Sequence, residues 1–197
     1  MECKGAQFFI ETGLFAHHSG FLTVGYCVYS RTKMSAITQR VLLSALGSGF
    51  CDSVEVPSLG ASGGILVAWR SDLGTTGARR VDNHSVSIQF CQNDGLVWWF
   101  TCVYGSQGNE EKVQFLQELR DIREAFPGSW MIAGDFNLIY KDEDKNKSNY
   151  NRAMMGRFRR FINDLALKDI PLPGRKFTRS NLQNSPTGQT GYGAMFS

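Results

Sequence analysis

Asp135 and Asn137 are two polar residues that directly follow a short apolar run in the stretch S-W-M-I-A-G-D-F-N-L-I-Y (129–140). If the chain is still extended there, the carboxylate and the carboxamide point to the same side. Gly134 removes a side chain where the backbone must turn or something must approach closely. Such a pair could hold a hard cation or a phosphate oxygen. An Asx-type turn that closes a strand explains the same spacing, so both interpretations stay open.

The segments that must position this pair are mostly strands. The apolar run 130–133 predicts a buried strand, and Tyr104 ends another predicted strand, where sites often collect. A tyrosine that only covers the rim of the core would look the same. The glycine-rich turn at 60–64 opens a strand rather than a helix and lacks G-K-[ST], which excludes a phosphate-binding P-loop. Strands are predicted at 21–29, 50–56, 65–69, 85–91 and 96–104.

Helical periodicity is clearest in two segments, 109–126 and 153–167. A third helix is predicted over 35–46, and Phe8 to Ile10 could begin a further one that continues through Leu14 and Phe15. The outer face of the 153–167 helix carries Arg152, Arg159 and Arg160, which could touch phosphates or only be solvated. The mixed order of strands and helices indicates an α+β or layered α/β domain.

The composition is that of an ordinary globular protein. The 197 residues include 42% hydrophobic and 20% charged residues and carry a net charge of +3, which suits a single domain over 1–197 and does not oppose a polyanionic partner. The odd number of cysteines, without a C-x-x-C pair, argues against a zinc site and a disulfide framework. No apolar run reaches bilayer length, and the N-terminus has no signal-peptide pattern. We therefore expect an intracellular monomer, nuclear or cytoplasmic, without a membrane partner.

Four segments taken together resemble the endonuclease/exonuclease/phosphatase superfamily, and more closely the endonuclease domain of LINE-type (non-LTR) retrotransposons. They are G-A-S-G-G-I-L-V-A-W, V-Y-G, W-M-I-A-G-D-F-N and F-x-x-F-I-x-D-L-x-L-x-D-x-P-L-P-G-R-x-F-T. The resemblance covers 61–186 and leaves 187–197 as a divergent tail. It implies a four-layered, DNase I-like α/β sandwich, with two sheets face to face and helices outside. It also implies Mg²⁺-dependent hydrolysis of a nucleic-acid phosphodiester, with DNA as the partner.

The resemblance assigns a role to each candidate residue. Asp135 would be the catalytic carboxylate that activates water and would contribute to holding the metal. Asn137 would orient the phosphate or stabilise charge that builds on its oxygens. Tyr104, in V-Y-G, would meet the same phosphoryl group, and Thr178, in F-T-R-S-N, matches a position beside the bound phosphate.

The chain also departs from this family. Relatives carry an asparagine in an N-terminal W-N-C-R-G strand, where this chain has Glu2, and a metal-binding glutamate in Q-E-T-K, where it has Arg31. A guanidinium has five donors and no acceptor, so it cannot bind Mg²⁺. Asp135 is thereby left as a weak metal ligand whose glutamate partner is missing.

The family's terminal motifs, S-x-L-D-R and the S-D-H segment with its catalytic histidine, are absent from the last residues. The histidines, His17, His18 and His84, all lie far upstream. We therefore expect a sandwich that is incomplete at the C-terminus, with an exposed sheet edge, and a weakened or inactive nuclease. The alternative is a non-catalytic remnant or nucleic-acid-binding module. A phosphatase for small phosphorylated molecules is a third reading.

Overall fold

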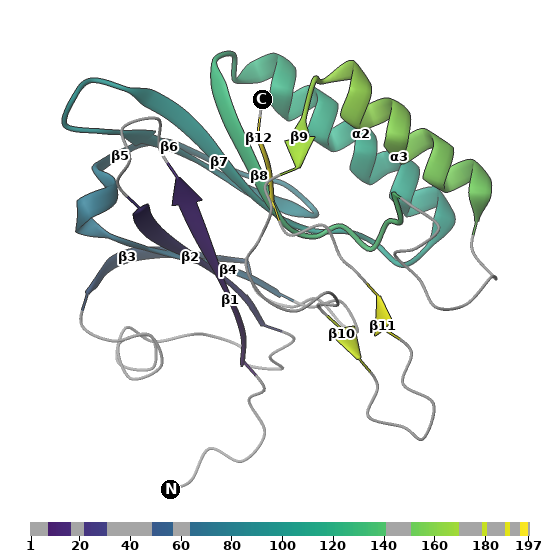
Figure 1. Cartoon of the computed structure of the whole chain (residues 1–197), viewed down its shortest axis with the longest axis horizontal. Coiled ribbons are helices and arrows are strands. Elements are labelled where there is room, and N and C mark those ends of the chain that lie inside the picture. The colour runs from purple at the N-terminus through teal and green to yellow at the C-terminus, as the bar shows by residue number, and fades with distance from the viewer. Residues whose placement is uncertain are drawn as a thin grey trace, which may run out of the picture.

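Two β-sheets lie face to face, and a pair of helices covers the outer face of the larger sheet (Figure 1). The structure is a computed structural model, and it describes residues 8–16, 22–30, 49–56, 64–140, 151–169, 179–180, 188–189 and 194–196. Three layers of the expected four-layered sandwich are thus described, and they confirm the predicted fold class. The helix predicted over 35–46 lies outside the described residues.

The smaller sheet has four antiparallel strands in the order β1-β2-β4-β3. These strands are β1 (Phe8–Ala16), β2 (Leu22–Ser30), β3 (Phe50–Val56) and β4 (Gly64–Arg70). The helix begun at Phe8 is therefore a wrong prediction. The nine-residue register of β1 against β2 shows why: pairing with a β-branched, aromatic neighbour outweighs a weak helical pattern.

The larger sheet has six strands in the order β5-β6-β7-β8-β12-β9. Strands β7 and β8 run parallel and are joined through helix α2, while the other neighbours are antiparallel. The strands are β5 (Thr75–Val81), β6 (Ser85–Cys91), β7 (Val97–Tyr104), β8 (Ser129–Asp135), β9 (Lys168–Asp169) and β12 (Ala194–Phe196). Outside this sheet, a 3-10 turn (Ser71–Leu73) follows β4, and β10 (Arg179–Ser180) pairs with β11 (Gly188–Gln189).

Each face of the larger sheet has its own apolar core. The outer face packs against α2 (Asn109–Ala125) and α3 (Arg152–Asp164), and Trp130 and Phe158 are fully buried there. The inner face packs against β4 through residues such as Ile65, Val86 and Cys102. This two-sided burial explains why β7 and β8 are apolar throughout.

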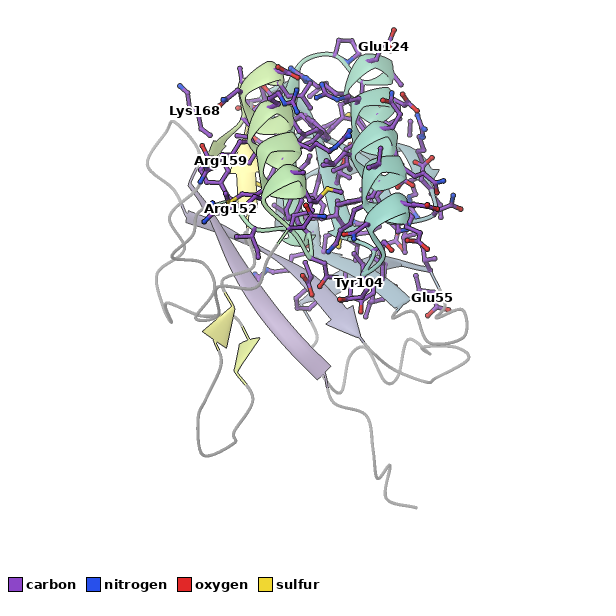
Figure 2. All side chains as sticks on the ribbon, turned by 90° about the vertical axis from the view of Figure 1, so that its right-hand side faces the viewer. Glu55, Tyr104, Glu124, Arg152, Arg159 and Lys168 are labelled. Atoms are coloured by element: carbon purple, nitrogen blue, oxygen red, sulfur yellow. The ribbon has the colours of Figure 1, made fainter. Side chains whose placement is uncertain are left out.

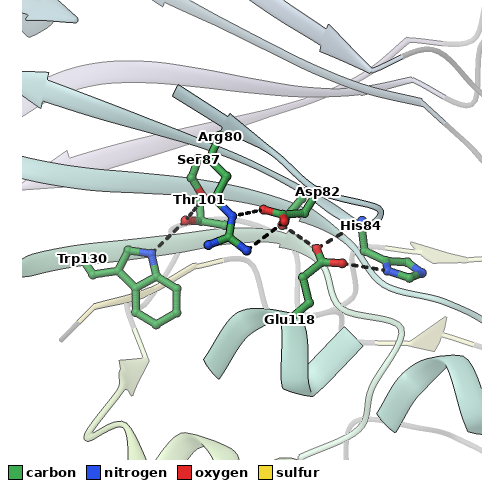
Figure 3. Close-up of polar contacts among 8 residues, drawn as sticks. Arg80, Asp82, His84, Ser87, Thr101, Glu118 and Trp130 are labelled. Carbon is green, nitrogen blue, oxygen red and sulfur yellow. Dashed lines mark hydrogen bonds and ion pairs between the residues drawn. The ribbon is translucent and has the colours of Figure 1, made fainter. Parts of the chain in front are cut away.

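A row of buried polar side chains crosses the outer face beneath the helices. Trp130 Nε1 donates to Thr101 Oγ1 at 2.8 Å, and Thr101 Oγ1 lies 2.9 Å from Ser87 Oγ (Figure 3). The three residues come from β8, β7 and β6, so the hydrogen bonds tie adjacent strands together. Buried polar groups that satisfy one another in this way add specificity to an otherwise apolar interface.

The C-terminal segment contributes a strand to the larger sheet, although its sequence shows no strand periodicity. Strand β12 pairs with β8 along three residues, from Ala194 opposite Ala133 to Phe196 opposite Met131, so this part of β8 is not a sheet edge. Cys102 is disulfide-bonded, although the odd number of cysteines argues against a disulfide framework, whereas Cys91 is a free thiol. Among the described residues, no helix is long and apolar enough to cross a membrane.

Candidate active-site edge

Tyr104 and Asp135 are brought together at one edge of the larger sheet. They occupy paired positions at the carboxyl ends of the parallel strands β7 and β8. Side chains on a strand alternate between faces, and Asp135 has the same parity as Met131 and Ala133, which pack on the inner face beside Tyr104. Both candidate side chains therefore lie on the face that looks toward the smaller sheet.

The chain turns sharply directly after Asp135. Asn137 N–H donates to Asp135 Oδ1 at 3.0 Å, which is the Asx-type turn that the spacing allowed. Asn137 has φ +49°, a region that asparagine tolerates better than most residues. The Asx-type turn and the binding of a cation or phosphate are therefore compatible interpretations, because the turn uses only one oxygen of Asp135. Its other oxygen, Oδ2, has no hydrogen-bond partner among the described residues.

The Asn137 carboxamide joins the two strand ends. Its Nδ2 donates to the Gly105 carbonyl, and its Oδ1 accepts from Gln107 Nε2 at 2.8 Å. The side chain is only 9% exposed, so these bonds are made away from bulk water. One of the two Nδ2 hydrogens remains after the bond to Gly105. Asn137 therefore clamps the loop after β7 and retains one donor for a ligand.

Gly105 follows Tyr104 and must be a glycine at this position. A Cβ placed there would lie 2.1 Å from the Phe136 carbonyl oxygen. The Gly105 N–H also donates to the Asp135 carbonyl oxygen at 2.7 Å. The Y-G and G-D-F-N segments are therefore in direct backbone contact, which fixes the phenol of Tyr104 relative to the carboxylate of Asp135.

A polar cluster holds the neighbouring strand against Tyr104. Glu118, from α2, accepts a hydrogen bond from Ser85 Oγ at 2.6 Å and lies 3.3 Å from His84 Nδ1 (Figure 3). The His84 carbonyl in turn accepts from the Tyr104 N–H at 2.8 Å. The imidazole lies against Phe115, under α2, so His84 supports the strand end from the helix side.

The smaller sheet presents the end of β2 at the same edge. Trp69, near the end of β4, meets Phe90, near the end of β6, with ring centroids 5.8 Å apart. The start of β4 therefore lies at the opposite end of the sandwich, where β7 ends. Ser30 pairs with Gly64 at that start, and Figure 2 shows Glu55 of β3 at the same end as Tyr104. Strand β2 thus ends, at Ser30, on the same edge as Tyr104.

The remaining predicted site residues are not placed. Thr178, Glu2 and Arg31 lie outside the described residues, so their roles stay predictions. In the part of the chain that is described, no three His, Cys, Asp or Glu side chains gather as a metal site would require. The described residues alone therefore do not make up a site for Mg²⁺, which takes carboxylate oxygens in octahedral geometry.

Sequence reasoning missed two residues that shape this edge. Gln107 holds the Asn137 carboxamide, and Glu118 holds the start of β6. Both contacts join residues about 30 positions apart in the chain, and no local pattern signals them. The one hint for Gln107 is its place in the short loop that follows V-Y-G.

Comparison with known proteins identifies the fold. No protein-family model and no curated protein matches the chain. Among solved structures, the endonuclease domain of TRAS1, a telomere-specific non-LTR retrotransposon, matches with a TM-score of 0.58 at 12% identity, over 76% of this chain and 67% of that domain. The human Nocturnin catalytic domain with bound sulfate anion matches with a TM-score of 0.46 at 15% identity, over 81% and 64%. The likeness to the TRAS1 endonuclease domain shows that this chain shares its fold, in agreement with the α/β sandwich that the sequence motifs predict.

Proposed function

We propose that the chain is an endonuclease-like domain of retrotransposon type whose capacity to hydrolyse DNA phosphodiesters is strongly reduced or lost. The part of this proposal that concerns phosphodiester chemistry rests on one observation, the pairing of Tyr104 with Asp135 on one face of the sheet edge. The fold shared with the TRAS1 endonuclease domain supports it. The loss is supported by Arg31, which stands where the resembling family has its metal-binding glutamate.

The residues at the edge suggest how a phosphodiester would be handled. Asp135 Oδ2 would accept a proton from the attacking water, while Oδ1 stays bonded to the turn. The remaining Nδ2 hydrogen of Asn137 would donate to a phosphate oxygen, and the Tyr104 hydroxyl would meet the same group. Thr178 would lie beside that phosphate.

Mg²⁺ is the cofactor that the family resemblance implies, and we propose that its affinity here is low. When bound, the cation would neutralise charge on the phosphate oxygens. Arg31 would place a positive charge where relatives place a carboxylate, and Asp135 would be left without its partner ligand. Electrostatic repulsion and a lost oxygen ligand both act against the metal.

Nicking of supercoiled plasmid DNA in Mg²⁺ tests the proposal. The matched control is Asp135→Ala, prepared by the same purification so that contaminating nuclease is equal. We expect the wild-type protein to nick no faster than this variant. Robust nicking that disappears in Asp135→Ala would contradict the loss of activity.

A further inference from the structure

A line of cations runs along the exposed surface of α3. Arg152, Arg159 and Arg160 are exposed on the helix, and exposed Lys168 continues the line beyond it. We call these four residues the basic stripe. Figure 2 shows Arg152, Arg159 and Lys168 along the side of α3 farther from α2. Asp164, the one acid of the helix, instead pairs with Arg120 of α2 at 2.8 Å.

Charge is segregated between the two helices. Helix α3 carries four arginines and one aspartate, whereas α2 carries five acidic and three basic residues. The chain as a whole has a net charge of only +3. Helix α3 by itself therefore carries a net charge of +3, whereas α2 carries −2, and a cluster of arginines on one helix face is the electrostatic footprint of a polyanion-binding surface.

The sequence of α3 is poorly suited to helix stability alone. Arg152 stands at the positive end of the helix dipole, and the first turn holds no acid, which is unfavourable by a few tenths of a kcal/mol or more. Gly156 lies mid-helix, although a Cβ there would meet nothing within 4 Å. A helix-interior glycine costs about 1 kcal/mol relative to alanine. Residues that are unfavourable for local structure are expected at functional sites.

The cationic groups of the stripe remain available to a ligand. Within the described parts of the chain, none of the four forms an ion pair. Arg159 Nε donates to the Tyr140 carbonyl at 2.6 Å, and its guanidinium lies 5.8 Å from the Tyr140 ring centre. That contact orients the guanidinium and leaves its terminal N–H groups free to donate.

The stripe begins at the active-site edge. Asn151, which caps α3, lies 3.4 Å from Asn109 at the start of α2, so both helices start where β7 and β8 end. A duplex that crosses Tyr104 and Asp135 could continue along α3. A helix of 13 residues is about 20 Å long, which matches roughly six base-pair steps of about 3.4 Å.

We propose that the basic stripe binds the phosphate backbone of duplex DNA, independently of catalysis at Asp135. The arginines suit phosphate, which they can contact with two parallel hydrogen bonds. The aromatic residues of α3, Phe158 and Phe161, are fully buried, so the helix offers no stacking platform for single strands. It likewise exposes no large apolar residue that could insert into a membrane surface.

Fluorescence anisotropy with a fluorescein-labelled 20-base-pair duplex tests the proposal with the full chain. If all four cations contact phosphates, log Kobs should fall with log[NaCl] with a slope of about −3.6, or about 150-fold between 50 and 200 mM. Arg152→Gln/Arg160→Gln should reduce the slope to about −1.8, or about 12-fold. Circular dichroism confirms that the variants fold.

A relocation variant separates the stripe from net charge. It adds Gln114→Lys and Gln117→Lys, both exposed on α2, to the two stripe substitutions, so the net charge equals that of the wild type. We expect its binding to stay weak, and wild-type affinity would overturn the proposal. Equal or tighter binding to single-stranded DNA, or to phosphatidylserine vesicles, would also overturn it. The binding assay is run without Mg²⁺ and measures no cleavage, so a failure here is distinct from any result of the nicking assay.

Discussion

Tyr104 and Asp135 stand opposite each other where the parallel strands β7 and β8 end, with both side chains on the face that looks toward the smaller sheet. A shift of one residue between these strands would move one of the two side chains to the helix face. The register is held by buried neighbours on both strands, including Cys102 and Ala133. The juxtaposition of Tyr104 and Asp135 is therefore a consequence of core packing.

Gly105→Ala should lower the free energy of unfolding by about 1–3 kcal/mol, because the new methyl group would overlap the Phe136 carbonyl. Gly156→Ala is the matched control, since its methyl group would enter open space and should stabilise by about 1 kcal/mol. Urea denaturation followed by circular dichroism measures both. Equal effects of the two substitutions would contradict the contact between Y-G and G-D-F-N.

Asn137→Ala should lower the free energy of unfolding by about 1–3 kcal/mol, because it leaves the Gly105 carbonyl without its donor. Asp135→Ala removes one hydrogen bond at a less buried position and should cost about 0.5–1.5 kcal/mol. Asn137→Gly accepts the positive φ and isolates the loss of the hydrogen bonds. If the Asn137 variants are as stable as the wild type, the hydrogen bonds of Asn137 do not stabilise the loop that follows β7.

Glu118→Gln should destabilise the chain by about 1–3 kcal/mol. Glu118 Oε1 accepts hydrogen bonds from Ser85 Oγ and from the His84 N–H, and hydrogen bonds to a charged carboxylate are roughly twice as strong as those to a neutral carboxamide. Glu124→Gln, exposed on the same helix, should change stability by less than about 0.5 kcal/mol. Thermal unfolding of the two variants side by side provides the comparison. An unchanged melting temperature for Glu118→Gln would show that the cluster does not hold the start of β6.

The strands around the site were predictable because their residues are of the apolar types that indicate a buried strand. Strand β7 and the start of β8 are apolar on both faces, so they are recognisable without knowledge of their neighbours. Strand β5, T-T-G-A-R-R-V, was not predicted, because an edge strand paired on one side only needs little apolar surface. The three-residue β12 depends entirely on its pairing with β8 and β9, which no local pattern reveals.

The candidate site likewise contains residues that the sequence predicted and residues that only the structure revealed. Asp135, Asn137 and Tyr104 were found from short motifs, because a glycine beside a polar residue at a strand end leaves a local signature. The contact of Gln107 with Asn137 and that of Glu118 with Ser85 arise only when β6, β7, β8 and α2 come together. Those tertiary contacts required the folded chain.

Mg²⁺ affinity, measured by isothermal titration calorimetry, tests the central claim most directly. The claim is that Asp135 has lost its metal-binding partner, with Arg31 at the matching position. The wild-type protein should bind Mg²⁺ more weakly than about 1 mM, and Asp135→Ala should not differ from it. Arg31→Glu should tighten binding, and adding Asp135→Ala to that variant should remove the gain. Submillimolar binding by the wild type that is lost in Asp135→Ala would contradict the claim.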